Sequence, residues 1–160
     1  MQNTTPGSFF IDILRKGTPD ATAWIKGNEQ NPQLSGAARF YYTPYEGTLV
    51  EVEVFGLPNV RIPGSTNFYG MHIHENGNCT PPFDQTGDHY SREPEQHPQH
   101  TGDMVPLLGG QGYAWTSFYD KRLRIPEIMG RSVVIHAMPD DFHTQPSGDS
   151  GMKIGCGVIR

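Results

Sequence analysis

The sequence has no long hydrophobic run and no run of basic residues. No segment of its 160 residues approaches the roughly 20 consecutive apolar residues that a membrane-spanning helix needs. The formal net charge of −5 disfavours nucleic acid and anionic membranes as partners. Residues 1–17 lack the basic and apolar segments of a signal peptide. We therefore expect neither a membrane protein nor a nucleic-acid-binding protein.

Cysteine is also scarce: the chain has only Cys79 and Cys156. Two readings stay open for them. A disulfide between them would close a loop of about 77 residues and stabilise the fold by about 4–5 kcal/mol in the chain-entropy model. Two buried thiols are the default in a cytosolic protein. A cysteine pair favours an oxidising, extracytoplasmic compartment, whereas the missing signal segment favours the cytoplasm.

Helical periodicity is weak throughout, whereas glycine and proline, at 19 and 14 residues, mark many turns. Alternation is strongest in residues 47–56, where Val50, Val52 and Val54 share one face of a predicted strand. Six shorter strand-like runs are 21–27 (ATAWIKG), 36–42 (GAARFYY), 69–75 (YGMHIHE), 112–119 (GYAWTSFY), 131–138 (RSVVIHAM) and 153–159 (KIGCGVI). Seven or eight short strands predict a single all-β domain, an antiparallel sandwich or barrel.

Two segments interrupt this pattern, residues 77–111 and residues 137–152. Both are rich in turn-forming residues and show no strand alternation. Long loops inside a compact domain are usually functional or disordered. The first segment holds three of the seven histidines, which favours a function for it.

Two histidines stand one residue apart in the run GMHIHE, residues 70–75. Side chains alternate along a strand, so His72 and His74 face one way, and Met71 and Ile73 face the core. Such a pair can offer two ligands to a metal, although a half-polar surface strand can carry the same pattern.

The remaining histidines extend this pattern. His97, His100 and Asp103 follow each other at three-residue steps, and His89 is available as a fourth ligand for zinc. His136 ends a strand-like run and would give the strand pair a third imidazole, in an all-imidazole site that suits copper. Taken alone, His136 could equally be a core histidine bonded to a backbone carbonyl.

Together these motifs resemble those of the copper–zinc superoxide dismutases. The segments GMHIHE, HTGD, GRSVVIHAMPDD and GCGVI follow each other in that family's order. The similarity runs from about residue 20 to the C-terminus. It divides the chain into an N-terminal extension, residues 1–18, and a dismutase-like domain, residues 19–160.

The resemblance implies an eight-stranded antiparallel Greek-key barrel or sandwich, immunoglobulin-like, with two long functional loops. It also implies a site for two metal ions. Copper would be held by His72, His74, His89 and His136, and zinc by His89, His97, His100 and Asp103. His89 would bridge the two metals, Asp140 would hydrogen-bond a ligand of each, and Cys79 and Cys156 would form a disulfide. His143 matches nothing and is expected to be a solvated loop histidine.

The activity implied by the resemblance is that of an oxidoreductase, dismutation of superoxide to dioxygen and hydrogen peroxide. His89 and Lys153 would be the catalytic residues, His89 as proton carrier and Lys153 as the cation that attracts superoxide. The family usually has an arginine where Lys153 stands, and lysine lacks the planar fork that orients an anion with two donors. The two loops are also shorter than usual. The oligomeric state stays open, with a homodimer as one alternative.

Three other interpretations account for parts of this pattern. A copper- or zinc-binding store or carrier on the same fold is favoured only by Lys153. A cupin-type metal enzyme also begins with His-x-His, but it needs a glutamate a few residues later, and Glu75 comes too early. A structural sandwich with incidental histidines leaves six matching ligand histidines unexplained.

Overall fold

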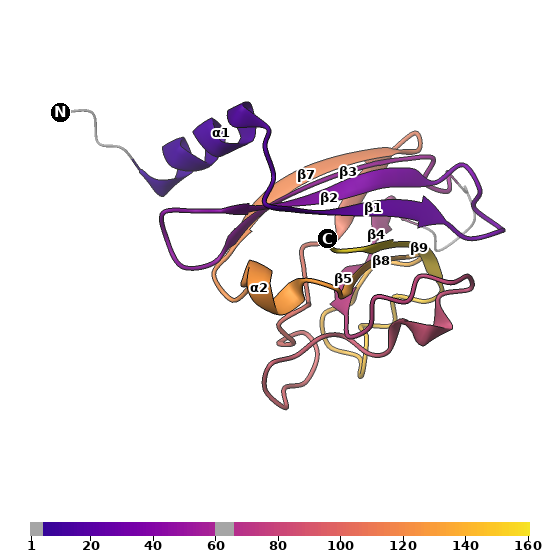
Figure 1. The fold of residues 1–160 in the computed structure, drawn as a ribbon. Coiled ribbons are helices and arrows are strands. Elements are labelled where there is room, and N and C mark those ends of the chain that lie inside the picture. Colours follow the sequence, from indigo (N-terminus) through magenta and orange to yellow (C-terminus); the bar gives the residue numbers. More distant parts are fainter. Residues whose placement is uncertain (1–4, 60–65) are drawn as a thin grey trace.

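The computed structural model describes residues 5–59 and 66–160 and is dominated by short strands (Figure 1). The strands are β1 (Ala21–Gly27), β2 (Ser35–Tyr42), β3 (Thr48–Phe55), β4 (Phe68–Tyr69), β5 (Met71–His74), β6 (Leu107–Gly110), β7 (Tyr113–Asp120), β8 (Ser132–His136) and β9 (Lys153–Val158). The helices are α1 (Pro6–Lys16) and α2 (Ile125–Ile128), with a 3₁₀ turn at Asp84–Thr86. Within the described ranges, no helix has the length and apolar character needed to cross a membrane.

All neighbouring strands pair antiparallel in one sheet of order β4-β6-β7-β3-β2-β1-β9-β8-β5. Only Gly70 separates β4 from β5 along the chain, yet these strands lie at opposite ends of that order. The sheet must therefore curl until its two edges approach each other, which gives the half-barrel in Figure 1. The predicted all-β antiparallel class is confirmed.

The described residues contain nine strands rather than seven or eight, for two reasons. The run 69–75 is not one strand, because Gly70 divides it between the two edges of the sheet. Strand β6 lies inside segment 77–111, where no strand was expected. Its pairs with β7 involve Gly109 and Gly110, at the end of the strand, and glycines carry no strand signal in a sequence.

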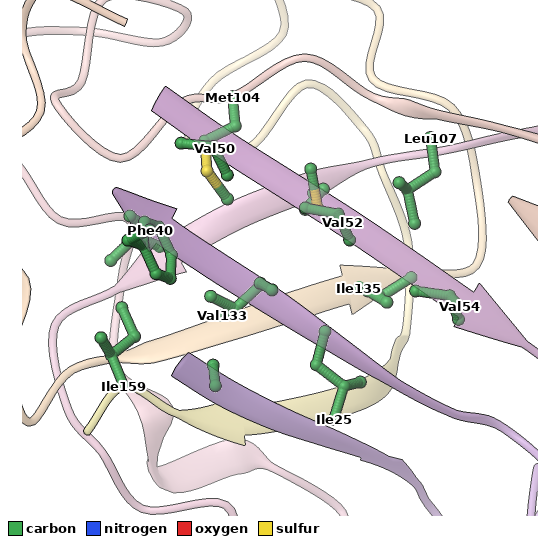
Figure 2. Packing of buried hydrophobic residues seen from close by; sticks show 14 of the residues in the cluster. Ile25, Phe40, Val50, Val52, Val54, Met104, Leu107, Val133, Ile135 and Ile159 are labelled. Atoms are coloured by element: carbon green, nitrogen blue, oxygen red, sulfur yellow. The ribbon is translucent and has the colours of Figure 1, made fainter. Parts of the chain in front are cut away.

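The core lies on the inner face of this curled sheet. Val50, Val52 and Val54 of β3 have no exposed surface, and Phe40 of β2 and Ile25 of β1 pack on the same side (Figure 2). This confirms the alternation predicted for residues 47–56. Burial of such apolar side chains is the main stabilising contribution to the fold.

Helix α1 precedes the sheet and lies against its outside (Figure 1). Pro6 stands in its first turn, and Gly17 ends it in a left-handed conformation with φ +65°. Phe10 stacks on Tyr119 of β7 with ring centroids 4.9 Å apart, but no residue of the helix is fully buried. Phe10, Ile13 and Leu14 recur at helical spacing, so this helix corrects the expectation that helical periodicity is weak throughout the chain.

Candidate metal centre

Strand β5 is buried on both faces, so its histidines lie inside the molecule. Met71 and Ile73 belong to the hydrophobic core and have no exposed surface. His72 and His74 point to the other face, yet they are only 0% and 2% exposed. A cover over the histidine face must therefore come from elsewhere in the chain.

The loop between β5 and β6, residues 75–106, provides this cover by running back along β5. Two isolated backbone bridges join them, His74 to His89 and His72 to Asp103. The backbone N–H of Ile73 donates to the carbonyl of Gly102 at 2.9 Å. A Cβ on Gly102 would lie 2.3 Å from the Ile73 carbonyl oxygen, so this close approach requires glycine. The loop thus carries His89 and Asp103 to the histidines of β5.

Four buried histidines form a first cluster: His72, His74, His89 and His136. One ring nitrogen of each lies within 4.8 Å of the others. His136 is the last residue of β8, the strand that pairs with β5. The rings of His72 and His89 stack with centroids 3.8 Å apart. Three separate segments of the chain therefore contribute imidazoles to one point.

Two of these rings direct lone pairs at each other. Nδ1 of His74 bonds the carbonyl oxygen of Gly87 at 2.8 Å, and Nδ1 of His136 bonds that of Gly151 at 3.1 Å. A carbonyl only accepts, so each Nδ1 carries the hydrogen and each Nε2 a lone pair. The two Nε2 atoms are 3.3 Å apart. Burial lowers the pKa of His74 to about 2 and of His136 to about 3, so neither ring is charged at neutral pH. A cation shared by these lone pairs would remove their repulsion.

The other two rings of the cluster each retain one unpaired nitrogen. Nε2 of His72 bonds Asp140 at 2.7 Å, and Nδ1 of His89 bonds Asp103 at 2.7 Å. The remaining atoms, His72 Nδ1 and His89 Nε2, are buried and have no hydrogen-bond partner among the described residues. Such groups are costly in a folded protein and call for an explanation. A bound metal ion explains them, because it takes a nitrogen lone pair.

A second cluster consists of His72, His89, His97 and Asp103. His100 lies outside this 4.8 Å group, but its Nδ1 is 3.0 Å from Oδ2 of Asp103, and Nδ1 of His97 is 3.2 Å from the same oxygen. Both Nδ1 atoms are buried without a hydrogen-bond partner in the described part of the chain. His72 has one free ring nitrogen and cannot serve both clusters. His100 is the better candidate for the fourth ligand here.

Asp140 connects the two clusters. Its Oδ2 bonds Nε2 of His72 at 2.7 Å, and its Oδ1 bonds Nε2 of His97 at 2.8 Å. Burial alone raises the pKa of Asp140, but hydrogen bonds from His72, His97 and the backbone N–H of Phe142 outweigh it and lower the pKa to about 2. The ionised carboxylate fixes the tautomer of both rings, so that Nδ1 of each is left as the ligand atom.

Lys153 lies beside the first cluster, opposite His136 in the pairing of β8 with β9. Its Nζ is 2.8 Å from Oγ1 of Thr86 and 3.4 Å from the carbonyl oxygen of Gly87, which His74 also uses. Burial lowers the pKa of Lys153. Thr86 was not anticipated from the sequence, since a lone threonine in a loop belongs to no recognisable pattern.

A disulfide joins Cys79 to Cys156 and ties the long loop to β9. Among the residues described, neither cysteine is left free. His143 lies apart from both clusters, with 79% of its side chain exposed, as expected for a solvated histidine.

The residues present fit two metal ions. The first cluster offers four imidazole nitrogens, which suits copper, and the second offers imidazoles with a carboxylate, which suits zinc. Both are buried and already oriented by hydrogen bonds from the far side of each ring.

Comparisons with known proteins agree with this arrangement. Residues 34–159 match the family described as copper/zinc superoxide dismutase. A Cu-Zn superoxide dismutase of Deinococcus radiodurans is 32% identical over 154 residues, covering 82% of this chain and 80% of its own length. A copper chaperone for superoxide dismutase from Rattus norvegicus is 28% identical over 82% of this chain, which spans 50% of the chaperone.

Among solved structures, a double mutant of a SOD-like protein from Bacillus subtilis is similar, with a TM-score of 0.73 and 26% sequence identity. The similarity covers 86% of this chain and 95% of that one. The fold, the two clusters and the sequence matches lead to one conclusion. The chain belongs to the copper–zinc superoxide dismutase family.

Proposed function

We propose that this chain is a superoxide dismutase with a copper and a zinc ion. The proposed copper ligands are His72 Nδ1 and the Nε2 atoms of His74, His89 and His136; the proposed zinc ligands are the Nδ1 atoms of His89, His97 and His100 and the Asp103 carboxylate. The observation that carries the proposal is the pair of Nε2 lone pairs, on His74 and His136, held 3.3 Å apart in a buried site. A shared cation makes this arrangement favourable at neutral pH.

The chemistry that copper supplies when bound is a one-electron couple between Cu(II) and Cu(I). One superoxide is thereby oxidised to dioxygen, and a second, with two protons, is reduced to hydrogen peroxide. His89 would use both ring nitrogens, because its Nδ1 faces Asp103 and its Nε2 faces the first cluster. When it is not bound to the metal, Nε2 of His89 would hold a proton and could pass it to the peroxide product, the second proton coming from water.

Lys153 would attract the substrate. The ammonium group is half-buried beside His74 and His136, and no carboxylate of the described residues forms an ion pair with it. Its charge therefore remains available to an incoming anion, although the molecule as a whole is acidic. Since superoxide carries one negative charge, a single ammonium is sufficient to bias its approach.

The first test is the dismutation rate of the chain reconstituted with copper and zinc, with both metals quantified in the same sample. We expect one copper and one zinc per chain and a rate constant of about 10⁸–10⁹ M⁻¹s⁻¹, near the diffusional limit. The His89→Gln variant should lose nearly all activity, because glutamine cannot face both metals. His143→Gln is the matched control and should keep the full rate, since His143 is exposed and outside both clusters.

A second candidate function is metal storage or transfer without catalysis. The similarity to copper chaperones supports it, as does a lysine at position 153. Two bound metals with a rate no higher than that of the His89→Gln variant would reject the dismutase proposal and favour this alternative. The disulfide is compatible with an oxidising compartment for either function.

A further inference from the structure

We infer that Thr86 is a positioning residue, which holds the Lys153 ammonium inside the approach to the first histidine cluster. This inference rests on the proposed function, because it assigns Thr86 a part in substrate attraction. Thr86 Oγ1 lies 2.8 Å from Lys153 Nζ, whereas the other two acceptors, the carbonyls of Gly87 and Phe83, are 3.4 Å and 3.5 Å away. The hydroxyl therefore makes the only short contact that the ammonium has among the described residues.

The direction of each hydrogen bond around Thr86 is fixed by chemistry. An ammonium only donates, so the Thr86 oxygen must accept from Lys153. The single hydroxyl hydrogen is free to donate to the carbonyl oxygen of Phe83, 2.9 Å away. Thr86 has no exposed surface, so water does not compete for either bond. Because the Thr86 hydroxyl accepts from Lys153 and donates to Phe83, its orientation is fixed and its oxygen holds the ammonium in one place.

Such an anchor matters because lysine is a flexible residue with a compact, strongly hydrated charge. Asp84 and Asp88 are exposed residues of the same loop, and both raise the pKa of Lys153 by their charge. Without Thr86, the ammonium could turn toward these carboxylates or toward bulk water. With it, the ammonium stays next to the Gly87 carbonyl, one hydrogen bond away from His74. Thr86 thus keeps the cation directed to the site rather than to the surface.

The matched variants are Thr86→Val, which removes the hydroxyl and keeps the shape, and Thr86→Ser, which keeps the hydroxyl. Thr48→Val is the control for lost stability, because Thr48 is also buried and its hydroxyl donates to a carbonyl, that of Leu123 at 2.9 Å, without contacting Lys153. Lys153→Met, alone and combined with Thr86→Val, completes a double-mutant cycle.

Two readouts decide the question. In the zinc-loaded chain, NMR of the lysine ammonium groups should show a slowly exchanging Lys153 signal in the wild type and in Thr86→Ser and Thr48→Val, but not in Thr86→Val. With only four lysines in the chain, the assignment is direct.

In the chain loaded with copper and zinc, azide titrated against the copper absorption band should bind about tenfold more weakly to Thr86→Val, as expected for loss of one hydrogen bond to a charged group. In the Lys153→Met background, Thr86→Val should change azide binding no further.

An unchanged Lys153 signal in Thr86→Val would overturn the inference, as would equal weakening of azide binding by Thr86→Val and Thr48→Val. The ammonium readout needs no dismutation, so it separates the two proposals. Loss of the signal in Thr86→Val, together with a wild type that binds both metals but is inactive, would reject the dismutase and keep the anchor. An active wild type whose Lys153 signal does not depend on Thr86 would support the dismutase proposal and reject the role of Thr86.

Discussion

Single hydrogen bonds decide which nitrogen of each histidine is available as a ligand. His74 and His136 donate from Nδ1 to backbone carbonyls, whereas His72 and His97 donate from Nε2 to Asp140. The site therefore contains two classes of imidazole. One class keeps Nε2 free because its Nδ1 bonds a backbone carbonyl, and the other keeps Nδ1 free because its Nε2 bonds Asp140. Replacing the partner would change the tautomer, and with it the ligand atom, without altering the histidine itself.

Outside the metal centre, Tyr41 predicts a pH dependence of stability. It is 2% exposed, its hydroxyl donates to Glu51 at 3.0 Å, and burial with this carboxylate raises its pKa to about 12. Between pH 10 and 12 the unfolded chain releases the phenolic proton while the folded chain keeps it, so the free energy of unfolding falls as pH rises. We expect the wild type to lose up to about 2 kcal/mol more than Tyr41→Phe across this window, measured by urea unfolding. Parallel curves for the two proteins would contradict this.

At the scale of elements, the loop between β5 and β6 is fastened at both of its sides. Backbone bridges hold it to β5, and on the other side the disulfide and Lys153 hold it to β9. His89 and Thr86 both lie in the fastened part. A loop with so few strand contacts can position ligands because it is tied at several points rather than folded as a sheet.

Helix α1 is, by contrast, loosely attached, and this predicts a tolerated truncation. Its clearest contacts are aromatic, Phe10 with Tyr119 and Tyr45, and none of its residues is buried. Deleting residues 1–18, the proposed extension, should lower the free energy of unfolding by only about 1–2 kcal/mol. Denaturant unfolding of both forms would measure the change, with zinc content as the control. A truncated chain that fails to fold would show that the domain begins before residue 19.

On the scale of the whole molecule, the negative net charge repels the proposed substrate, which is an anion. The net charge is −5, whereas Lys153 provides a local cation beside the site. A homodimer stays a prediction. A second chain with the same negative charge would increase the repulsion of superoxide. Local attraction must therefore outweigh long-range repulsion for fast dismutation.

This balance predicts a salt effect with a definite sign. Salt screens charges over about 8 Å at 0.15 M, so raising the ionic strength should slow dismutation by the wild type, in which Lys153 dominates locally. In Lys153→Met the repulsive net charge remains, and salt should leave the rate unchanged or increase it. Lys121→Met removes the same charge from a side chain that is 73% exposed and should keep the wild-type slope. Equal slopes in all three proteins, measured by pulse radiolysis, would exclude steering by Lys153.

Local patterns in the sequence were sufficient for most of the strands and for the grouping of candidate ligands. Alternation in residues 47–56 predicts the buried valines of β3, and spacing alone places His72 and His74 on one face of a strand. Both are properties of a few consecutive residues, and strand geometry transmits them directly into structure. The order of the motifs along the chain then indicates the family.

Tertiary structure decided everything that depends on the closing of the sheet. The division of one predicted strand at Gly70, the exclusion of His100 from the second 4.8 Å group, and the contact of Thr86 with Lys153 follow from no local pattern. Each joins or separates residues through the curl of the sheet and the path of the long loop. A sequence states which residue types are present, but distances between residues far apart in the chain are set only when the packed core fixes where each loop returns.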